Sequence, residues 1–158
     1  MSQEVYNYVV LSSSTTNLIL NKTNNCTFQI QWQNVIPSKY SNNKLLMRMR
    51  FSSQIAVATT DALIVYANFG NTYVFDNNST AQSSIIGIVN PIGCNATTTT
   101  AQAYYSCGYY DNPPVLMNYP DSQQLSITFN GISNIITSVN PASNPNIWVL
   151  ILSFEILK

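Results

Sequence analysis

The chain has 158 residues, and only 8% of them are charged, against roughly 25% in an average globular domain. Six basic residues balance six acidic ones, so no basic patch is available for nucleic-acid phosphates, and we expect no direct contact with nucleic acid. Histidine is absent, which excludes Ser-His-Asp and Cys-His catalytic sites. Asn, Ser and Thr instead make up about a third of the residues.

The N-terminal segment, residues 1–20, is expected to form an arm or an extra strand. Its strand patterns are Val5–Leu11 and Leu18–Leu20. The segment contains Glu4 but no Lys or Arg, which argues against an arm that binds nucleic acid. Neither here nor further along does an apolar run approach the roughly 18 residues of a membrane span, so we expect no span.

Four later segments alternate apolar and polar residues with the period of two that is typical of half-buried β-strands. In the first, Thr27–Gln33, the residues Phe28, Ile30 and Trp32 fall on one face. The other three segments are Leu45–Phe51, Leu125–Phe129 and Trp148–Ile156.

In two of these segments the residues on the second face also predict what covers that face. Around Trp148–Ile156 the second face carries Ile147, Val149 and Ile151 before it turns polar, so we predict a central strand that is covered on both sides over its first half. In Leu45–Phe51 the second face carries Arg48 and Arg50. A solvated face is expected there, and salt bridges to a neighbouring subunit are the alternative.

Weaker strand patterns fill the rest of the chain, and short turn signals separate them. The strand candidates are Ala62–Phe69 with Tyr73–Phe75, Ile85–Val89, Ala101–Cys107 and Val115–Asn118. The turn signals include Asn42-Asn43, Asp76-Asn77-Asn78, Asn90-Pro91, Asp111–Pro114 and Tyr119–Asp121. Asn130-Gly131 directly follows an alternating strand and predicts a hairpin. No stretch shows apolar spacing near 3.6, so we predict no long helix.

About eight short strands without a long helix predict an all-β fold, an antiparallel β-sandwich in a single domain over residues 1–158. An immunoglobulin-type sandwich would place a Trp between two cysteines. Here Trp32 follows Cys26 closely, and Cys94 lies far downstream. A single jelly roll of about eight strands fits the pattern better.

The three cysteines, Cys26, Cys94 and Cys107, form no CxxC motif and have no His partner. Zinc binding needs such closely spaced Cys or His ligands. We therefore expect reduced and mostly buried thiols.

Six carboxylates are the remaining candidates for chemistry: Glu4, Asp61, Asp76, Asp111, Asp121 and Glu155. A pair of them would be needed for glycoside hydrolysis, and the loops Asp76-Asn77-Asn78 and Asp111-Asn112 are weak calcium candidates. Aspartates in turns more commonly close the turn through their side-chain oxygens. We predict that the protein is not an enzyme and has no catalytic, cofactor-binding or metal-binding residues.

The adjacent tyrosines Tyr104-Tyr105 and Tyr109-Tyr110, together with Trp32, suggest an aromatic platform for sugars. The alternative function is therefore a lectin-like module that binds a carbohydrate or a receptor. Neighbouring residues on a strand point to opposite faces, so only half of these rings would face outward. Outward tyrosines serve equally well in a protein–protein interface.

The C-terminal half carries an ordered set of motifs. A Pro-rich segment, Tyr109–Pro120, precedes the strand Gln124–Phe129, an Asn130-Gly131 turn follows, and the strand Trp148–Ile156 closes the chain. This order resembles single-jelly-roll capsid proteins of large icosahedral double-stranded DNA viruses. Phe28–Trp32 is similar to the first long strand of that fold.

The resemblance implies a structural protein of the virion that is made in the host cytoplasm. It would be a minor capsid protein or the subunit of a pentameric vertex, the penton. Its partners would be copies of itself, as a trimer or a pentamer, and the major capsid protein. The net charge of zero agrees with such a role, because near-neutral proteins tend to associate.

Overall fold

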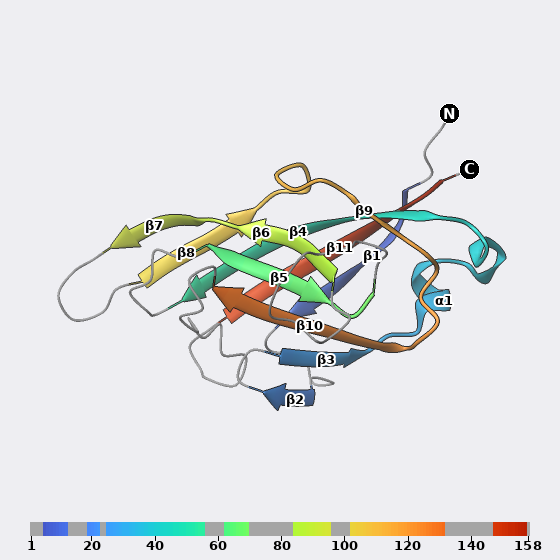
Figure 1. The fold of residues 1–158 in the computed structure, drawn as a ribbon, viewed down its shortest axis with the longest axis horizontal. Coiled ribbons are helices and arrows are strands. Elements are labelled where there is room, and N and C mark those ends of the chain that lie inside the picture. The colour runs from blue at the N-terminus through green and yellow to red at the C-terminus, as the bar shows by residue number, and fades with distance from the viewer. Residues whose placement is uncertain are drawn as a thin grey trace.

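Two antiparallel sheets pack face to face in the computed structural model, which describes residues 5–12, 19–22, 25–55, 62–69, 84–95, 102–131 and 147–157 (Figure 1). The six-stranded sheet has the order β1 (Val5–Ser12), β11 (Ile147–Ile156), β4 (Leu45–Ile55), β8 (Gln102–Cys107) and β7 (Pro91–Asn95), with β9 (Val115–Met117) also paired to β4. The five-stranded sheet has the order β2 (Ile19–Lys22), β3 (Asn25–Gln29), β10 (Gln124–Gly131), β5 (Leu63–Ala67) and β6 (Ser84–Val89).

The strand pairing is that of a jelly roll. When the short strands β2, β7 and β9 are left out, the first strand pairs with the last and the pairing continues inward: β1 with β11, β3 with β10, β4 with β8, and β5 with β6. Two further antiparallel pairings, β11 with β4 and β10 with β5, join these four pairs into the two sheets. The predicted all-β sandwich of jelly-roll type is therefore confirmed.

The core lies between the sheets and is built from the alternating residues that the sequence places on one face. Leu45, Met47, Met49 and Phe51 of β4 are all buried. The inward residues of β10 and β11 are buried as well: Leu125, Ile127, Phe129, Trp148, Leu150, Leu152, Phe154 and Ile156. At the centre, the Trp148 ring centroid lies 5.1 Å from that of Phe129 and 6.2 Å from that of Phe28.

Strand β11 lies between β1 and β4, so its predicted central position is confirmed. The predicted cover on its second face is only partial among the described residues, and the side chain of Ile147 lies outside the described set. Val149 and Ile151 are only half-buried, because the five-stranded sheet packs against the opposite face of β11.

The segment after β3 differs from its prediction. The predicted strand Thr27–Gln33 is too long, since β3 ends at Gln29 and Trp32 begins the helix α1 (Trp32–Val35). The Ile36 N–H donates to the Trp32 carbonyl at 2.7 Å, and both side chains are buried. The spacing of four residues between them, which is typical of one helix face, was hidden by the alternation that precedes it. A short 3-10 helix, η1 (Ser38–Tyr40), then leads toward β4.

One turn prediction is also wrong. Asn130 and Gly131 do not form a hairpin: they are the last residues of β10 and pair with Ile64 and Leu63 of β5. At Asn90-Pro91 the chain does leave one strand, since Asn90 separates β6 from β7, but the strand β7 that begins at Pro91 was not predicted. Proline is tolerated at the first position of an edge strand.

The other weak strand candidates agree with β1, β2, β5, β6, β8 and β9 within about two residues, the usual uncertainty of element ends. Tyr73–Phe75 and Asp76-Asn77-Asn78 lie outside the described residues. In the part of the chain that the structure describes, no helix has the length and apolar character needed to cross a membrane.

Candidate interaction surface

Arg48, one of the two arginines on the outer face of β4, has its partners within the chain. Its Nε atom lies 3.7 Å from Oε1 of Glu155, and its guanidinium carbon lies 5.1 Å from the centre of the Tyr110 ring. Arg50 is exposed. The structure therefore assigns Arg48 to an internal ion pair that neither alternative included, whereas Arg50 lies on the solvated face that the sequence predicts.

The structure does not bring the expected sugar platform together. Trp32 is 3% exposed, its Nε1–H donates to the Ser122 carbonyl at 2.7 Å, and its ring packs edge-on against Phe69 and Phe154. Tyr105 is also buried. Of the aromatic residues considered for the platform, Tyr110 is 86% exposed, Tyr109 is half-buried, and the side chain of Tyr104 lies outside the described set.

The described carboxylates have different partners. Asp111 accepts a hydrogen bond from the Gly108 N–H at 2.6 Å and so closes its own turn, as the turn pattern predicts. Glu155 faces Arg48, and Asp121 is exposed. Glu4, Asp61 and Asp76 lie outside the described residues. Within the described ranges, no three His, Cys, Asp or Glu residues gather in a way that could hold a metal ion.

The asparagine of the second calcium candidate, Asn112, is bound to an edge strand instead. Its Oδ1 accepts the Ile88 N–H at 2.8 Å, and its Nδ2 donates to the Ile88 carbonyl at 3.1 Å. The side-chain amide therefore pairs with β6 as a further strand would. Asn68, just after β5, does the same to β10: its Oδ1 accepts from the Ser126 N–H and its Nδ2 donates to the Gln124 carbonyl, both at 2.9 Å.

These amide pairs are sites that sequence reasoning missed. The high Asn content of the chain is the sequence signal for them, but composition alone does not show which asparagine bonds to which strand. An uncharged amide has both a donor and an acceptor, so it can satisfy both backbone groups of one residue. Asn112 thus covers part of the edge strand β6, and Asn68 extends the pairing of β5 with the central strand β10 beyond the end of β5.

Cys107, on β8, is a free thiol that is buried, as expected. Burial raises its pKa above the ordinary value of 9.0, and the nearby negative charge of Asp111 raises it further. The side chains of Cys26 and Cys94 lie outside the described set.

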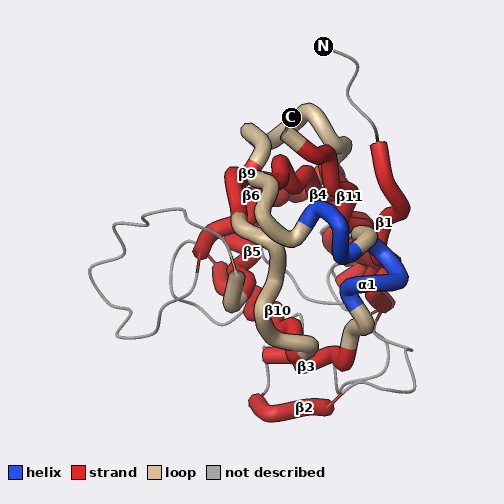
Figure 2. The backbone as a smooth tube through the Cα atoms, turned by 90° about the vertical axis from the view of Figure 1, so that its right-hand side faces the viewer, coloured by secondary structure: helices blue, strands red, loops and turns tan. Residues whose placement is uncertain are grey.

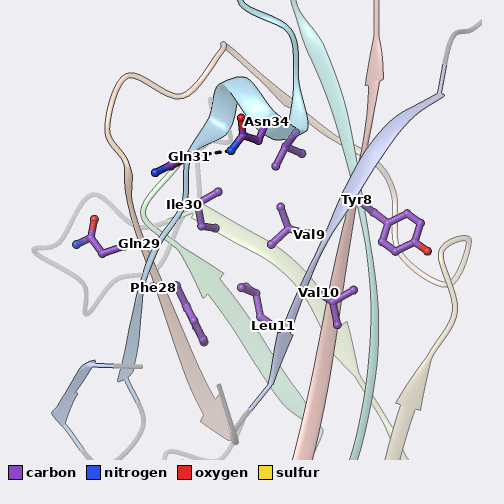
Figure 3. Close-up of a pocket in the computed structure, with 10 residues that line it drawn as sticks. Tyr8, Val9, Val10, Leu11, Phe28, Gln29, Ile30, Gln31 and Asn34 are labelled. Carbon is purple, nitrogen blue, oxygen red and sulfur yellow. Dashed lines mark hydrogen bonds between the residues drawn. The ribbon is translucent and has the colours of Figure 1, made fainter. Parts of the chain in front are cut away.

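A groove of about 440 Å³ opens on one side of the sandwich, between β1 and the segment that runs from β3 into α1 (Figure 3). The helix α1 lies between β1 and β3 at this side (Figure 2). Val9 and Leu11 of β1 and Phe28 and Ile30 of the β3 segment point toward one another there. The remaining lining residues are Tyr8, Val10, Gln29, Gln31, Asn34 and Val35, so the groove is apolar with amide groups and carries no charged side chain.

The face of β1 that points away from this groove is apolar too. Tyr8 is 61% exposed and Val10 is 53% exposed. Both residues border the groove, but their side chains project to the far side of β1 (Figure 3). Val10 pairs with Ile151 of β11, which is half-buried on the same outer face. Strand β1 therefore presents apolar side chains on both faces at the edge of its sheet.

Comparison with known proteins gives no relative: neither a protein-family model nor a curated protein matches the chain. The fold, the groove and the β1 edge therefore carry the functional inference. We call the combination of the groove and the outward residues Tyr8 and Val10 the β1 surface.

Proposed function

We propose that the protein is a structural subunit of an icosahedral viral capsid, either a minor capsid protein or the subunit of a pentameric vertex. Its partners are copies of itself, as a trimer or a pentamer, and the major capsid protein. It resides in the virion after synthesis in the host cytoplasm, and it acts through protein–protein contacts without a catalytic step.

The observation that carries this proposal is the β1 surface. Exposed apolar residues at a strand edge mark contact with another chain, because a free edge offers unpaired backbone groups as well as apolar area. Tyr8 and Val10 are more than half exposed, and the adjoining groove contains no charge that would have to be desolvated on binding. The jelly-roll fold agrees with the proposal, since viral capsid domains are among the proteins that use it.

A lectin-like module that binds a carbohydrate or a receptor is the second candidate, and the exposed ring of Tyr110 favours it. The burial of Trp32 removes the largest ring from the platform, and Arg48 already lies against the Tyr110 ring. A glycan array tests this function. A signal that Tyr110→Ala abolishes would support the lectin function, and an array without signal would exclude it for the glycans displayed.

Sedimentation velocity of the purified chain over a range of concentrations tests the structural function, with negative-stain electron microscopy of the same samples. Capsid subunits should form discrete oligomers or shells as the concentration rises. A chain that stays monomeric at every concentration, and that does not bind purified capsid shells, would contradict the proposal.

A further inference from the structure

The edge strands of the two sheets differ in the features that hinder pairing with another chain. Strand β2 has four residues, a register shift and a terminal Lys22. Strand β7 begins with Pro91 and has a register shift, and β9 has only three residues and follows Pro113-Pro114. On β6 the Asn112 amide occupies both backbone groups of Ile88. Short length, proline, lysine, bulges and cover by another group are the devices by which proteins keep sheet edges from pairing with other chains.

Strand β1 is the longest of these edge strands, with eight residues, and the sequence VYNYVVLS contains no Lys, Arg, Asp, Glu or Pro. Its one irregularity is a register shift between Tyr6 and Tyr8. From Tyr8 to Ser12 the strand pairs regularly with β11, and among the described residues no strand pairs with its other side. The helix α1 contacts β1, but no described strand lies against this edge, and β1 lacks the charge, the proline and the short length that protect the other edges.

We propose that β1 pairs with β1 of a second copy of this chain, antiparallel and across a two-fold axis at Val10, so that the two six-stranded sheets join into one. This inference rests on the proposed function and names the contact by which two copies meet. Edge-to-edge addition of a strand is a common mode of recognition, in which backbone hydrogen bonds supply affinity and the side chains supply specificity.

The second copy is favoured as the partner because the regular part of β1 is complementary to itself. A two-fold axis at Val10 sets Val10 opposite Val10 of the second copy on the outer face. On the inner face it sets Val9 opposite Leu11. At the centre of the contact apolar residues therefore face apolar residues on both sides of the joined sheet, and such directly opposed pairs stabilise antiparallel sheets. Towards each end of the contact Tyr8 faces the hydroxyl residue Ser12. No charge on β1 or in the groove opposes this approach.

The contact is isologous, so it closes with two copies and does not itself build a ring. A trimer or a pentamer needs a second, head-to-tail surface. In an icosahedral shell the two-fold contact would then link one ring to the next.

Substitutions at Val10 test the pairing, because residue 10 faces itself. Val10→Lys and Val10→Glu each place two like charges directly opposite one another. We expect each variant to weaken two-fold association at least about tenfold in sedimentation velocity. An equimolar mixture of the two variants should associate again, because Lys then faces Glu.

The matched control is Ile88→Lys, which places the same charge at a 43% exposed position on the protected edge strand β6 and should leave association unchanged. Thermal unfolding of each variant checks that it folds. Because Val10 is more than half exposed, we expect both Val10 variants to keep a cooperative unfolding transition.

Each remaining outcome has one meaning. If the wild-type chain associates and both Val10 variants associate equally well, the β1 pairing is overturned while the structural function stands. If the variants dissociate and their mixture stays dissociated, β1 meets a different surface and the two-fold pairing is overturned. A wild-type chain that is monomeric throughout and binds no shell overturns both proposals.

Discussion

Strands β1 and β6 are edge strands at opposite sides of the sandwich: β1 borders the groove beside β3, whereas β6 lies against β8. The backbone of β6 is bound at Ile88 by the amide of Asn112. Strand β1 has an exposed Tyr8 and Val10 on one face and an open apolar groove on the other. One fold therefore contains one closed edge and one open edge.

The difference teaches how a protein with few charges can control its sheet edges. Charged side chains, especially lysines, are the common protection of an edge strand. This chain has six basic residues in all, and on the edge strand β6 the side-chain amide of Asn112 takes the place of a charge. Strand β1 carries neither a charge nor a proline, and from Tyr8 to Ser12 no described strand pairs with its outer edge.

The largest expected effect comes from removing the core on which both edges depend. Trp148 is fully buried among Phe28, Phe51 and Phe129. Trp148→Ala should lower the free energy of unfolding by about 3–5 kcal/mol, because it leaves a large cavity. Urea denaturation measures this loss, with the exposed Tyr110→Ala as the control. A loss below about 1 kcal/mol would show that the sheets do not pack as described.

A smaller effect is expected when the closed edge is opened. Asn112→Ala removes two hydrogen bonds to β6, and at about 0.5–1.5 kcal/mol each the loss should be about 1–3 kcal/mol. Hydrogen exchange at the Ile88 amide should become faster, and β6 should gain a tendency to associate. Asn118→Ala is the matched control, since the Asn118 side chain accepts its hydrogen bond from an exposed lysine, Lys44. Equal exchange at Ile88 in both variants would count against the role of the amide.

A still smaller effect is expected at the ion pair beside the open edge. Glu155 and Arg48 are 15% and 21% exposed, and their charged atoms are 3.7 Å apart. Glu155→Gln should cost less than about 1 kcal/mol, as partly exposed pairs do, and the cost should shrink at high salt. Denaturation at two ionic strengths measures it. A cost that is large and independent of salt would mean that the pair is structural.

The smallest effect is a loss of folding stability at alkaline pH that comes from the Cys107 thiol and does not occur at pH 7. Its pKa is raised in the folded protein, so the folded state holds the thiol proton to higher pH than the unfolded state does. Stability from this group is complete below the unfolded pKa and is lost as the pH rises through the folded pKa. Above pH 9 the wild-type chain should lose stability relative to Cys107→Ala. Parallel profiles for the two proteins would contradict this prediction.

Much of the fold could be predicted from the sequence, because strict alternation over Leu45–Phe51 and Trp148–Ile156 leaves one arrangement that buries the apolar face. The helix at Trp32 and the strand at Pro91 could not. Over a few residues, apolar residues at alternate positions fit a strand as well as a short helix, so Phe28, Ile30 and Trp32 do not show where the strand ends. A proline next to an asparagine is typical of a turn, so Asn90-Pro91 does not indicate the short strand that follows.

The amide pairs and the open edge were harder still to predict. Asn112 and Ile88 are 24 residues apart and Asn68 and Ser126 are 58 apart, so only the tertiary fold shows that they meet. The sequence of β1 did contain a signal, apolar residues at Val9, Val10 and Leu11 without any charge nearby. That it is an edge strand follows only from the strand order.

Hydrogen exchange of the wild-type chain at low and high protein concentration tests the central claim most directly, because it reports on both edges in one sample. The β1 surface predicts that the amides of Val9–Leu11 become more protected as the concentration rises, while the Ile88 amide of β6 keeps the same exchange rate. Exchange in β1 that is identical at all concentrations, or new protection that appears on β6 instead, would contradict the account.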